Sequence, residues 1–221
     1  MNRTLSLVAL LAATTFAHAG PVNLLTNGGF ESTAVGNGSC INTGSIAGWT
    51  RTAGPGSGFE VRNNVAGAAK EGFNYLELDT NGNTTISQAL SNLTAGTTYD
   101  LSFWYSPREG VVAASNGIDV FWNGLLLDSV TGLGARSGNV WSQYQYRVTA
   151  KAGTNVLSFA AAGSSDGYGG SLDNARLSVP EPGSLALTLA ALAGIAFLPR
   201  RLRRNAEARR AAALASTLTR A

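Results

Sequence analysis

Histidine and cysteine are nearly absent from this 221-residue chain: each occurs once, as His18 and Cys40. A single cysteine cannot form an intramolecular disulfide, so the fold has to rely on its core or on a bound metal. His18 lies in an N-terminal segment that we expect to be removed, which leaves the mature domain without histidine. Its absence excludes Ser-His-Asp and Cys-His catalysis and excludes zinc sites with histidine ligands.

The N-terminal segment has the order of features found in secretory signals. Arg3 supplies a basic start, an apolar stretch follows over residues 5–16, and Ala17-His18-Ala19 fits the small-x-small cleavage rule. A short buried helix is the alternative interpretation. We predict a signal peptide over residues 1–19 and therefore an exported protein.

Charged residues are also few, at 13% of the chain. Residues 20–179 carry eight basic and eleven acidic side chains, so the net charge of +3 for the full chain comes from its termini. Because the domain itself is mildly acidic, the composition does not point to a nucleic-acid partner.

The middle of the chain is rich in Gly, Ser, Thr and Asn and shows no convincing helical periodicity. Residues 99–105 alternate with period 2, and Asn123-Gly124 separates two apolar runs as in a β-hairpin. Further strands are predicted over 23–25, 59–61, 74–78, 84–89, 118–122, 125–130, 141–148, 155–160 and 171–178. The pattern predicts an all-β sandwich or barrel, with residues 32–55 as a long surface loop.

Three segments resemble galactose-binding-like jelly rolls, which include many carbohydrate-binding modules. They are NLLTNGGFE at 23–31, ISQALSNLTAGTTYDLSFWY at 86–105 and GSLDNARL at 170–177. The resemblance implies a jelly-roll β-sandwich over residues 20–178.

The same resemblance implies a structural calcium ion at the edge where the first and last strands lie side by side. Glu31 and Asp173 would be its carboxylate ligands, with backbone carbonyls completing an oxygen shell. Alternatively, Glu31 caps a turn and Asp173 accepts hydrogen bonds from loop amides.

Two strands carry tryptophan on their polar side, a position that often marks an interface. Aromatic rings stack on sugars and polar side chains bind hydroxyls, so we expect a ligand face made of Trp104, Asp100, Trp141, Gln143, Gln145 and Arg147. Alternatively, loops cover this face and Trp104 packs beneath them. Trp122 reads as core, whereas Trp49 and Tyr168 lie in expected loops and are weaker candidates.

Glu77 and Asp79 are the carboxylate pair most suited to glycan hydrolysis, because they lie two apart on an expected strand. No framing motif accompanies them, and such pairs on β-sandwiches are usually solvated surface. We therefore expect a protein that is not an enzyme.

The C-terminal segment combines three features: Pro180-Glu181-Pro182, an uncharged run over 184–198, and a basic cluster of Arg200, Arg201, Arg203 and Arg204. The run is shorter than the roughly 20 residues of a comfortable bilayer span, and its arginines should stay cytoplasmic. Residues 179–204 closely resemble the PEP-CTERM sorting signal of Gram-negative bacteria. The resemblance implies a short transmembrane helix and cleavage by an exosortase-type transpeptidase.

The chain departs from that signal by continuing over residues 205–221, a basic, alanine-rich extension. A permanent single-span anchor is the competing interpretation of the tail.

These observations predict an exported, non-catalytic surface or matrix protein that binds or organises polysaccharide. It would be held at the inner membrane before processing and would then reach the cell surface or the medium. A structural or adhesive protein-binding module is the alternative, and a carboxylate-based glycan hydrolase is the third hypothesis.

Overall fold

The computed structural model describes residues 21–180, which contain most of the predicted sandwich. The predicted signal peptide, Glu181 and Pro182 of the sorting motif, the basic cluster and the extension lie outside the described residues. Over 21–180, no helix is both long enough and apolar enough to cross a membrane.

Twelve strands and one short 3-10 helix, η1 (Ala113–Ser115), form the described domain. The strands make two six-stranded sheets in which every pairing is antiparallel. In the order β1-β4-β5-β12-β7-β10, sheet A contains β1 (Ser39–Thr43), β4 (Phe59–Asn63), β5 (Asn74–Glu77), β12 (Ser171–Ser178), β7 (Thr98–Ser106) and β10 (Ser142–Thr149).

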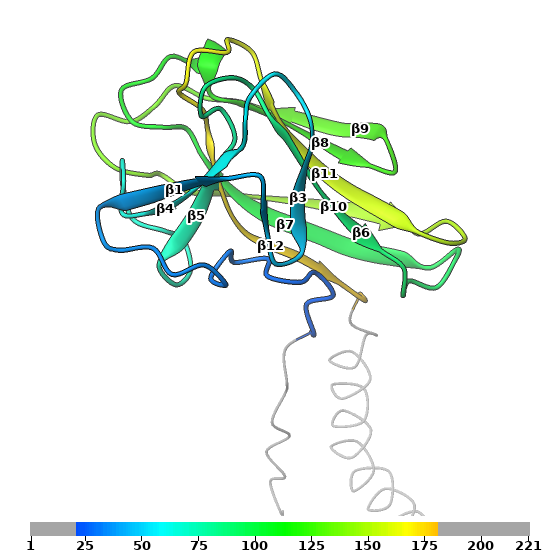
Figure 1. Ribbon diagram of the computed structural model, residues 1–221. Helices are drawn as coiled ribbons and strands as arrows, with labels where there is room; N and C mark the ends of the chain where they lie inside the picture. Colours follow the sequence, from blue (N-terminus) through cyan, green and yellow to red (C-terminus); the bar gives the residue numbers. More distant parts are fainter. Residues whose placement is uncertain (1–20, 181–221) are drawn as a thin grey trace, which may run out of the picture. The chain divides into compact units, whose positions relative to one another are not determined.

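Sheet B has the order β2-β3-β6-β11-β8-β9. Its strands are β2 (Ser45–Ile46), β3 (Trp49–Ala53), β6 (Thr85–Leu90), β11 (Asn155–Ala162), β8 (Gly117–Trp122) and β9 (Leu125–Val130). Figure 1 shows the two layers, with β1, β4 and β5 in one and β8, β9 and β11 in the other. The chain passes repeatedly between the sheets, so the all-β sandwich is consistent with a jelly roll.

Periodicity identified the strands well from residue 59 onward. Each of those predicted strands is present with its ends shifted by no more than two residues. The hairpin at Asn123-Gly124 is confirmed: both residues have positive φ, as the turn that joins β8 to β9 requires. The surface loop expected over 32–55 is wrong, because that segment holds β1, β2 and β3.

The core lies between the two sheets and is built from the alternating apolar side chains. Tyr99, Leu101, Phe103 and Tyr105 of β7 all face inward, as predicted. Phe103 meets Phe159 of sheet B edge-on, with ring centroids 5.1 Å apart. Trp49 belongs to this core, which corrects its assignment to a loop: it is fully buried, and its indole nitrogen donates to the carbonyl oxygen of Asn27 at 3.1 Å.

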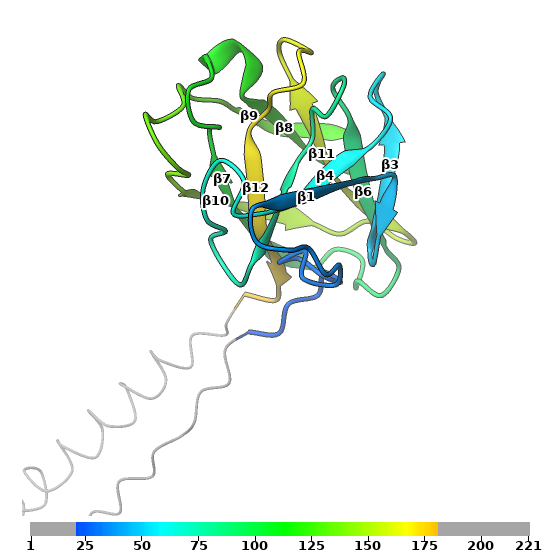
Figure 2. The same ribbon diagram turned by 60° about the vertical axis from the view of Figure 1, so that its left-hand side comes forward.

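The start of the described chain is tied to its end. The strand expected at residues 23–25 does not form; instead the Asn23 side chain bonds the backbone of β12 at Ala175 and Leu177. Leu24 N donates to Leu177 O at 2.7 Å, and Ala175 N donates to Gly28 O at 2.8 Å. Both views therefore show the two ends of the described chain leaving from the same end of the sandwich (Figures 1 and 2).

Candidate functional site

The outer face of sheet A, which points away from the core, carries most of the polar side chains that the sequence predicts to be functional. One row across it contains Arg62, Tyr75, Asp173, Trp104 and Gln143, from β4, β5, β12, β7 and β10 in turn. Tyr75 and Asp173 are nevertheless fully buried. They are buried because residues 64–73, which we name the covering loop, lie over the middle of this face.

Trp104 and Trp141 lie on the outer face as predicted, but both are engaged by the covering loop. The Lys70 ammonium sits 3.8 Å from the centre of the Trp104 ring, a cation–π contact. Trp141 donates to the carbonyl oxygen of Ala68 at 3.1 Å and meets the Tyr75 ring edge-on at 5.8 Å. The covering loop thus lies over both rings, as in the expected alternative, and sugar contact at them stays a prediction.

The other four predicted ligand residues lie on the open part of the same face. Asp100, Gln145 and Arg147 line a groove of about 510 Å³ together with Arg176. Gln143 is exposed opposite Trp104. The structure therefore separates the predicted ligand face into a covered aromatic half and an open polar half.

Glu31 and Asp173, the predicted calcium ligands, hold the same short stretch of backbone from two sides. Oδ2 of Asp173 accepts from the amides of Lys70 and Glu71 at 2.8 and 3.1 Å. Oε1 of Glu31 accepts from the amides of Phe73 and Asn74, each at 2.8 Å. Asp173 therefore accepts loop amides as the alternative expected, both carboxylates fix the end of the covering loop, and calcium binding stays a prediction.

The ionised form of Asp173 is disfavoured. Burial, and to a smaller extent the neighbouring Glu31, raises the pKa of Asp173 to about 7 although the amides of Glu71, Asn174 and Lys70 act to lower it. Within residues 21–180, no ion pair involves either acid, and no group of three or more His, Cys, Asp and Glu is placed to hold a metal. Both acids accept hydrogen bonds from backbone amides, and the calcium site expected at them stays a prediction.

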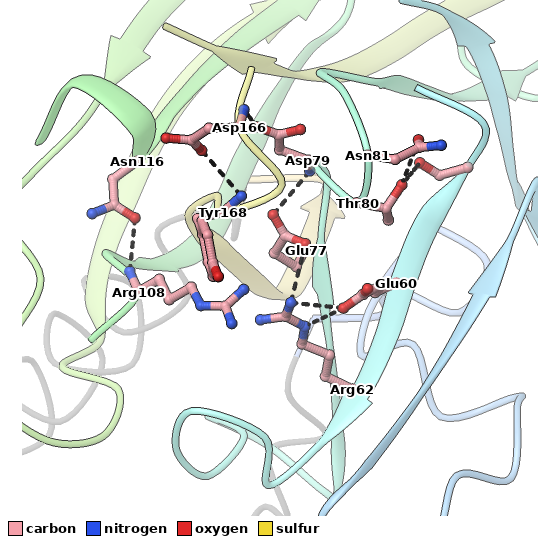
Figure 3. A network of polar contacts seen from close by, with 11 residues as sticks. Glu60, Arg62, Glu77, Asp79, Thr80, Asn81, Arg108, Asn116, Asp166 and Tyr168 are labelled. Atoms are coloured by element: carbon pink, nitrogen blue, oxygen red, sulfur yellow. Dashed lines mark hydrogen bonds and ion pairs between the residues drawn. The ribbon is translucent and has the colours of Figure 1, made fainter. Parts of the chain in front are cut away.

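A second polar group lies at the end of the outer face near β4 and β5, and we name it the arginine cluster: Glu60, Arg62, Glu77 and Arg108 (Figure 3). Arg62 forms ion pairs with Glu60 at 2.6 Å and with Glu77 at 3.3 Å. Burial lowers the pKa of Arg62, but the two carboxylates outweigh it and raise that pKa. Arg62 therefore remains charged although only 3% of it is exposed.

Glu77 and Asp79 are not solvated surface, which corrects that expectation: both are fully buried. Glu77 Oε1 accepts from the Asp79 amide at 2.9 Å, and Asp79 Oδ2 accepts from the Asp166 amide at 3.0 Å. Burial raises the pKa of Glu77 to about 8 against the opposing charge of Arg62, and it also raises the pKa of Asp79. The pair fixes neighbouring backbone rather than facing solvent.

Next to the arginine cluster, loops enclose a hollow of about 450 Å³ that we name the loop pocket. Its wall includes Ala66, Arg108, Gly110, Ser115, Asp166 and Tyr168. The Arg108 guanidinium stacks on the Tyr168 ring at 4.6 Å, and half of Tyr168 remains exposed. Asp166 accepts from Ser115 Oγ at 2.7 Å and from the Tyr168 amide at 3.1 Å. The pocket thus combines an aromatic ring, a guanidinium and a carboxylate in fixed positions.

Sequence reasoning did not find Arg62 or Arg108 and gave Tyr168 little weight. The only local signal is the alternation of Glu60 and Arg62 with the buried Phe59 and Val61, which places the two charges on the outer face. Nothing in the sequence near Arg108 indicates that its loop returns to β4. The pocket was therefore not predictable from periodicity.

Comparison with known proteins finds sequence similarity over part of the chain. No protein-family model matches the chain. Multifunctional-autoprocessing repeats-in-toxin proteins of Vibrio vulnificus and of Vibrio cholerae serotype O1 are each 34% identical to it over 154 residues. The match covers 69% of this chain but 3% of either toxin, so the chain spans only a small fraction of the length of these relatives.

Solved structures show a weaker likeness. TmCBM61 in complex with beta-1,4-galactotriose is 20% identical, with 72% of this chain and 99% of that chain covered and a TM-score of 0.49. The K1 cleaved adhesin domain of Lys-gingipain from Porphyromonas gingivalis W83 is 17% identical, with 65% and 99% covered and a TM-score of 0.48. At these identities and TM-scores, the ligands of those proteins carry no conclusion for this chain.

Proposed function

We propose that this chain is an exported, non-catalytic module that binds extracellular polysaccharide, with the loop pocket as its main contact. The observation that supports this most directly is the half-exposed ring of Tyr168 beside Arg108 and Asp166 in a preformed hollow. Sugar-binding sites need this combination, because a ring contacts the C–H faces and fixed polar groups bind the hydroxyls. The jelly-roll resemblance of three sequence segments supports the same function.

The engagement of the acidic side chains supports a binding role over hydrolysis. A glycosidase needs two carboxylates free to act on the two sides of the scissile bond. Glu77 and Asp79 are buried and bonded to backbone amides. At the loop pocket, Asp166 is held by Ser115 and Tyr168, and Glu109 accepts from the amide of Gly138.

Binding to immobilised polysaccharides tests this function. We expect the purified chain to bind at least one acidic or neutral polysaccharide and Tyr168→Ala to weaken binding by about tenfold, which corresponds to ~1.4 kcal/mol. Arg147→Ala tests the other candidate site, the open groove on the predicted ligand face. That face also includes Trp104, Trp141 and Gln145. Loss of binding in Arg147→Ala alone would move the site to that groove. Failure to bind any polysaccharide would favour the protein-binding alternative.

The sorting of the protein belongs to the same proposal and is supported by sequence alone. Pro180-Glu181-Pro182, the uncharged run and the following arginines match the order of a PEP-CTERM signal. In this proposal, an exosortase-type transpeptidase recognises the tail while it is held in the inner membrane. The module is then delivered to the cell surface or the medium, where polysaccharide is available.

We also propose that calcium stabilises the module at Glu31 and Asp173. The supporting observation is that the Asp173 carboxyl is fully buried beside Glu31, with no ion pair to balance its negative charge within residues 21–180. A bound cation would offset that charge and hold the covering loop against β12, a staple in a chain that cannot form a disulfide. Its remaining ligands would be backbone carbonyl oxygens.

Calcium should therefore raise the melting temperature above its value in a chelator. At a calcium concentration 100 times Kd, the gain is about 2.7 kcal/mol. Asp173→Asn should abolish this gain, whereas Asp128→Asn, at an acid on β9 bonded to Tyr146, should retain it. Thermal unfolding with and without calcium decides the matter: equal curves for the unmodified chain would rule the calcium site out.

A further inference from the structure

Three buried polar atoms without a hydrogen-bond partner lie around one spot behind the loop pocket. They are Nη1 of Arg62, Nη1 of Arg108 and the hydroxyl oxygen of Tyr75. Arg62 is 3% exposed and Tyr75 is fully buried. Burial raises the pKa of Tyr75, while Arg62, Asn139 and Arg108 around its hydroxyl lower it, so the three side chains are close neighbours. Oδ1 of Asn139, beside Tyr75, is also buried without a partner, but one amide oxygen cannot serve a hydroxyl and two guanidinium groups. Leaving buried donors unpaired is costly, so the two arginines still point to a missing acceptor.

The ion pairs of Arg62 leave one nitrogen of its guanidinium, Nη1, available for that acceptor. Nε and Nη2 are taken by Glu60 at 2.6 Å, and Nη2 also reaches Glu77 at 3.3 Å. Nη1 has no part in either ion pair. Figure 3 shows the guanidinium groups of Arg62 and Arg108 beside one another, with Glu60 on the side of Arg62 away from Arg108 and Glu77 above Arg62, towards Asp79.

Arg108 brings a positive charge that no ion pair within the described residues balances, although Glu77 and Glu60 act on it from farther away. Within residues 21–180, its side chain forms no ion pair and no hydrogen bond; its contact is the face of Tyr168. Burial and the neighbouring charge of Arg62 lower the pKa of Arg108 by more than Glu77, Glu60 and Tyr168 raise it.

The acids around the two arginines do not supply the missing acceptor. Glu60 and Glu77 are bound to the other nitrogens of Arg62. Asp166 and Glu109, on the pocket side of Arg108, accept hydrogen bonds from Ser115, Tyr168 and Gly138. Each of these carboxylates therefore has its own partners.

We propose that a single negative charge binds between Arg62 and Arg108, with the Tyr75 hydroxyl as a third donor. Guanidinium N–H groups suit hydrogen-bonding anions, and a bound anion would neutralise Arg108 and satisfy all three donors. A small free anion such as a halide has this chemistry. An acidic sugar could supply the same negative charge through its carboxylate, which would enter past Arg108 from the loop pocket. Only this second source depends on the polysaccharide-binding function.

The halide source is tested by thermal unfolding of the full chain in sodium chloride and sodium bromide. The reference is the sodium salt of the bulky buffer anion MES at equal ionic strength. We expect a saturable rise in melting temperature with either halide and at least a tenfold loss of apparent affinity in Arg108→Gln. Lys151→Gln, which removes one positive charge at an exposed residue outside both hollows, should respond like the unmodified chain.

Tyr75→Phe keeps the ring and removes only the third donor, so it tests the site if Arg108→Gln fails to fold. It should weaken halide affinity several-fold without loss of the fold. A purely structural role for Tyr75 would leave halide affinity unchanged.

The carboxylate source is tested with oligogalacturonate against its neutral methyl ester. A shift caused by the acid form alone, lost in Arg108→Gln and reduced by chloride, assigns the site to a ligand carboxylate. A halide response without this shift assigns it to a free anion and leaves the polysaccharide function to its own test. No response to either probe, or an equal salt effect in every variant, overturns the anion site.

Discussion

Asn116→Ala is expected to lower the free energy of unfolding by about 3 kcal/mol, the cost of leaving several buried backbone groups unpaired. Asn116 is fully buried, and its Nδ2 donates to the carbonyl oxygens of Val111, Val112 and Gly132 at 3.1, 3.3 and 3.1 Å. Its Oδ1 accepts from the Arg108 amide at 2.9 Å (Figure 3). One side chain thus joins two loops, and one of them forms a wall of the loop pocket.

Urea unfolding measures this loss, and Asn92→Ala is the matched control. Asn92 is exposed and bonds only Ser91, so its loss should change stability by less than about 0.5 kcal/mol. Asn116→Asp should be worse than Asn116→Ala near neutral pH, because a carboxylate would face three carbonyl oxygens. Equal stability of Asn116→Ala and Asn92→Ala would show that the loops do not depend on this side chain.

The same substitution bears on function, because Arg108 lies directly on the affected loop. If the polysaccharide contact is made at the loop pocket, Asn116→Ala should weaken binding even under conditions in which the chain stays folded. The stability loss and the binding loss would then have one cause, the release of residues 107–112 from their anchor.

Local alternation was enough to find the strands whose inner face is apolar. In β7 and β8, the buried side chains recur at every second position, and the hairpin residues Asn123 and Gly124 take the φ values expected of them. The same rule could not find β1, because four of its five residues are exposed and no side of it is apolar. Trp49 was missed for a related reason: its partners Asn27, Phe30 and Phe159 come from distant parts of the chain.

The direction of polar side chains was predictable, but their burial was not. Alternation correctly places Trp104 and Trp141 on the outer face, and it also places Glu77 there. Whether an outward side chain meets water depends on the covering loop and on the loops around the pocket. Those loops are positioned by single contacts such as Asp173 with Lys70 and Trp141 with Ala68, which have no periodic signature. Functional groups that gather under loops, such as Arg62 with Arg108, are therefore invisible until the fold is known.

Glu77→Gln is expected to flatten the dependence of stability on pH between about 5 and 8. In the folded chain, burial raises the pKa of Glu77 from its usual 4.5 to about 8. Between these values the native state binds more protons than the unfolded chain, so the free energy of unfolding falls as pH rises. The steepest slope for one such group is about 1.4 kcal/mol per pH unit, and it vanishes above the folded pKa.

Glutamine removes this titration while keeping the shape of the side chain and one oxygen, which can accept from the Asp79 amide as Oε1 of Glu77 does. The contact of Arg62 with Oε2 is given up. Urea unfolding from pH 4 to pH 9 in a chelator, which removes any calcium contribution, compares the two proteins. Near pH 4 both carry a neutral side chain at this position, so their stabilities should be similar, and Glu77→Gln should become the more stable protein as pH approaches 8. Asp173, whose pKa burial also raises, contributes a slope of the same sign to both proteins and cancels in the difference. Parallel curves would mean that Glu77 is ionised throughout, held by Arg62.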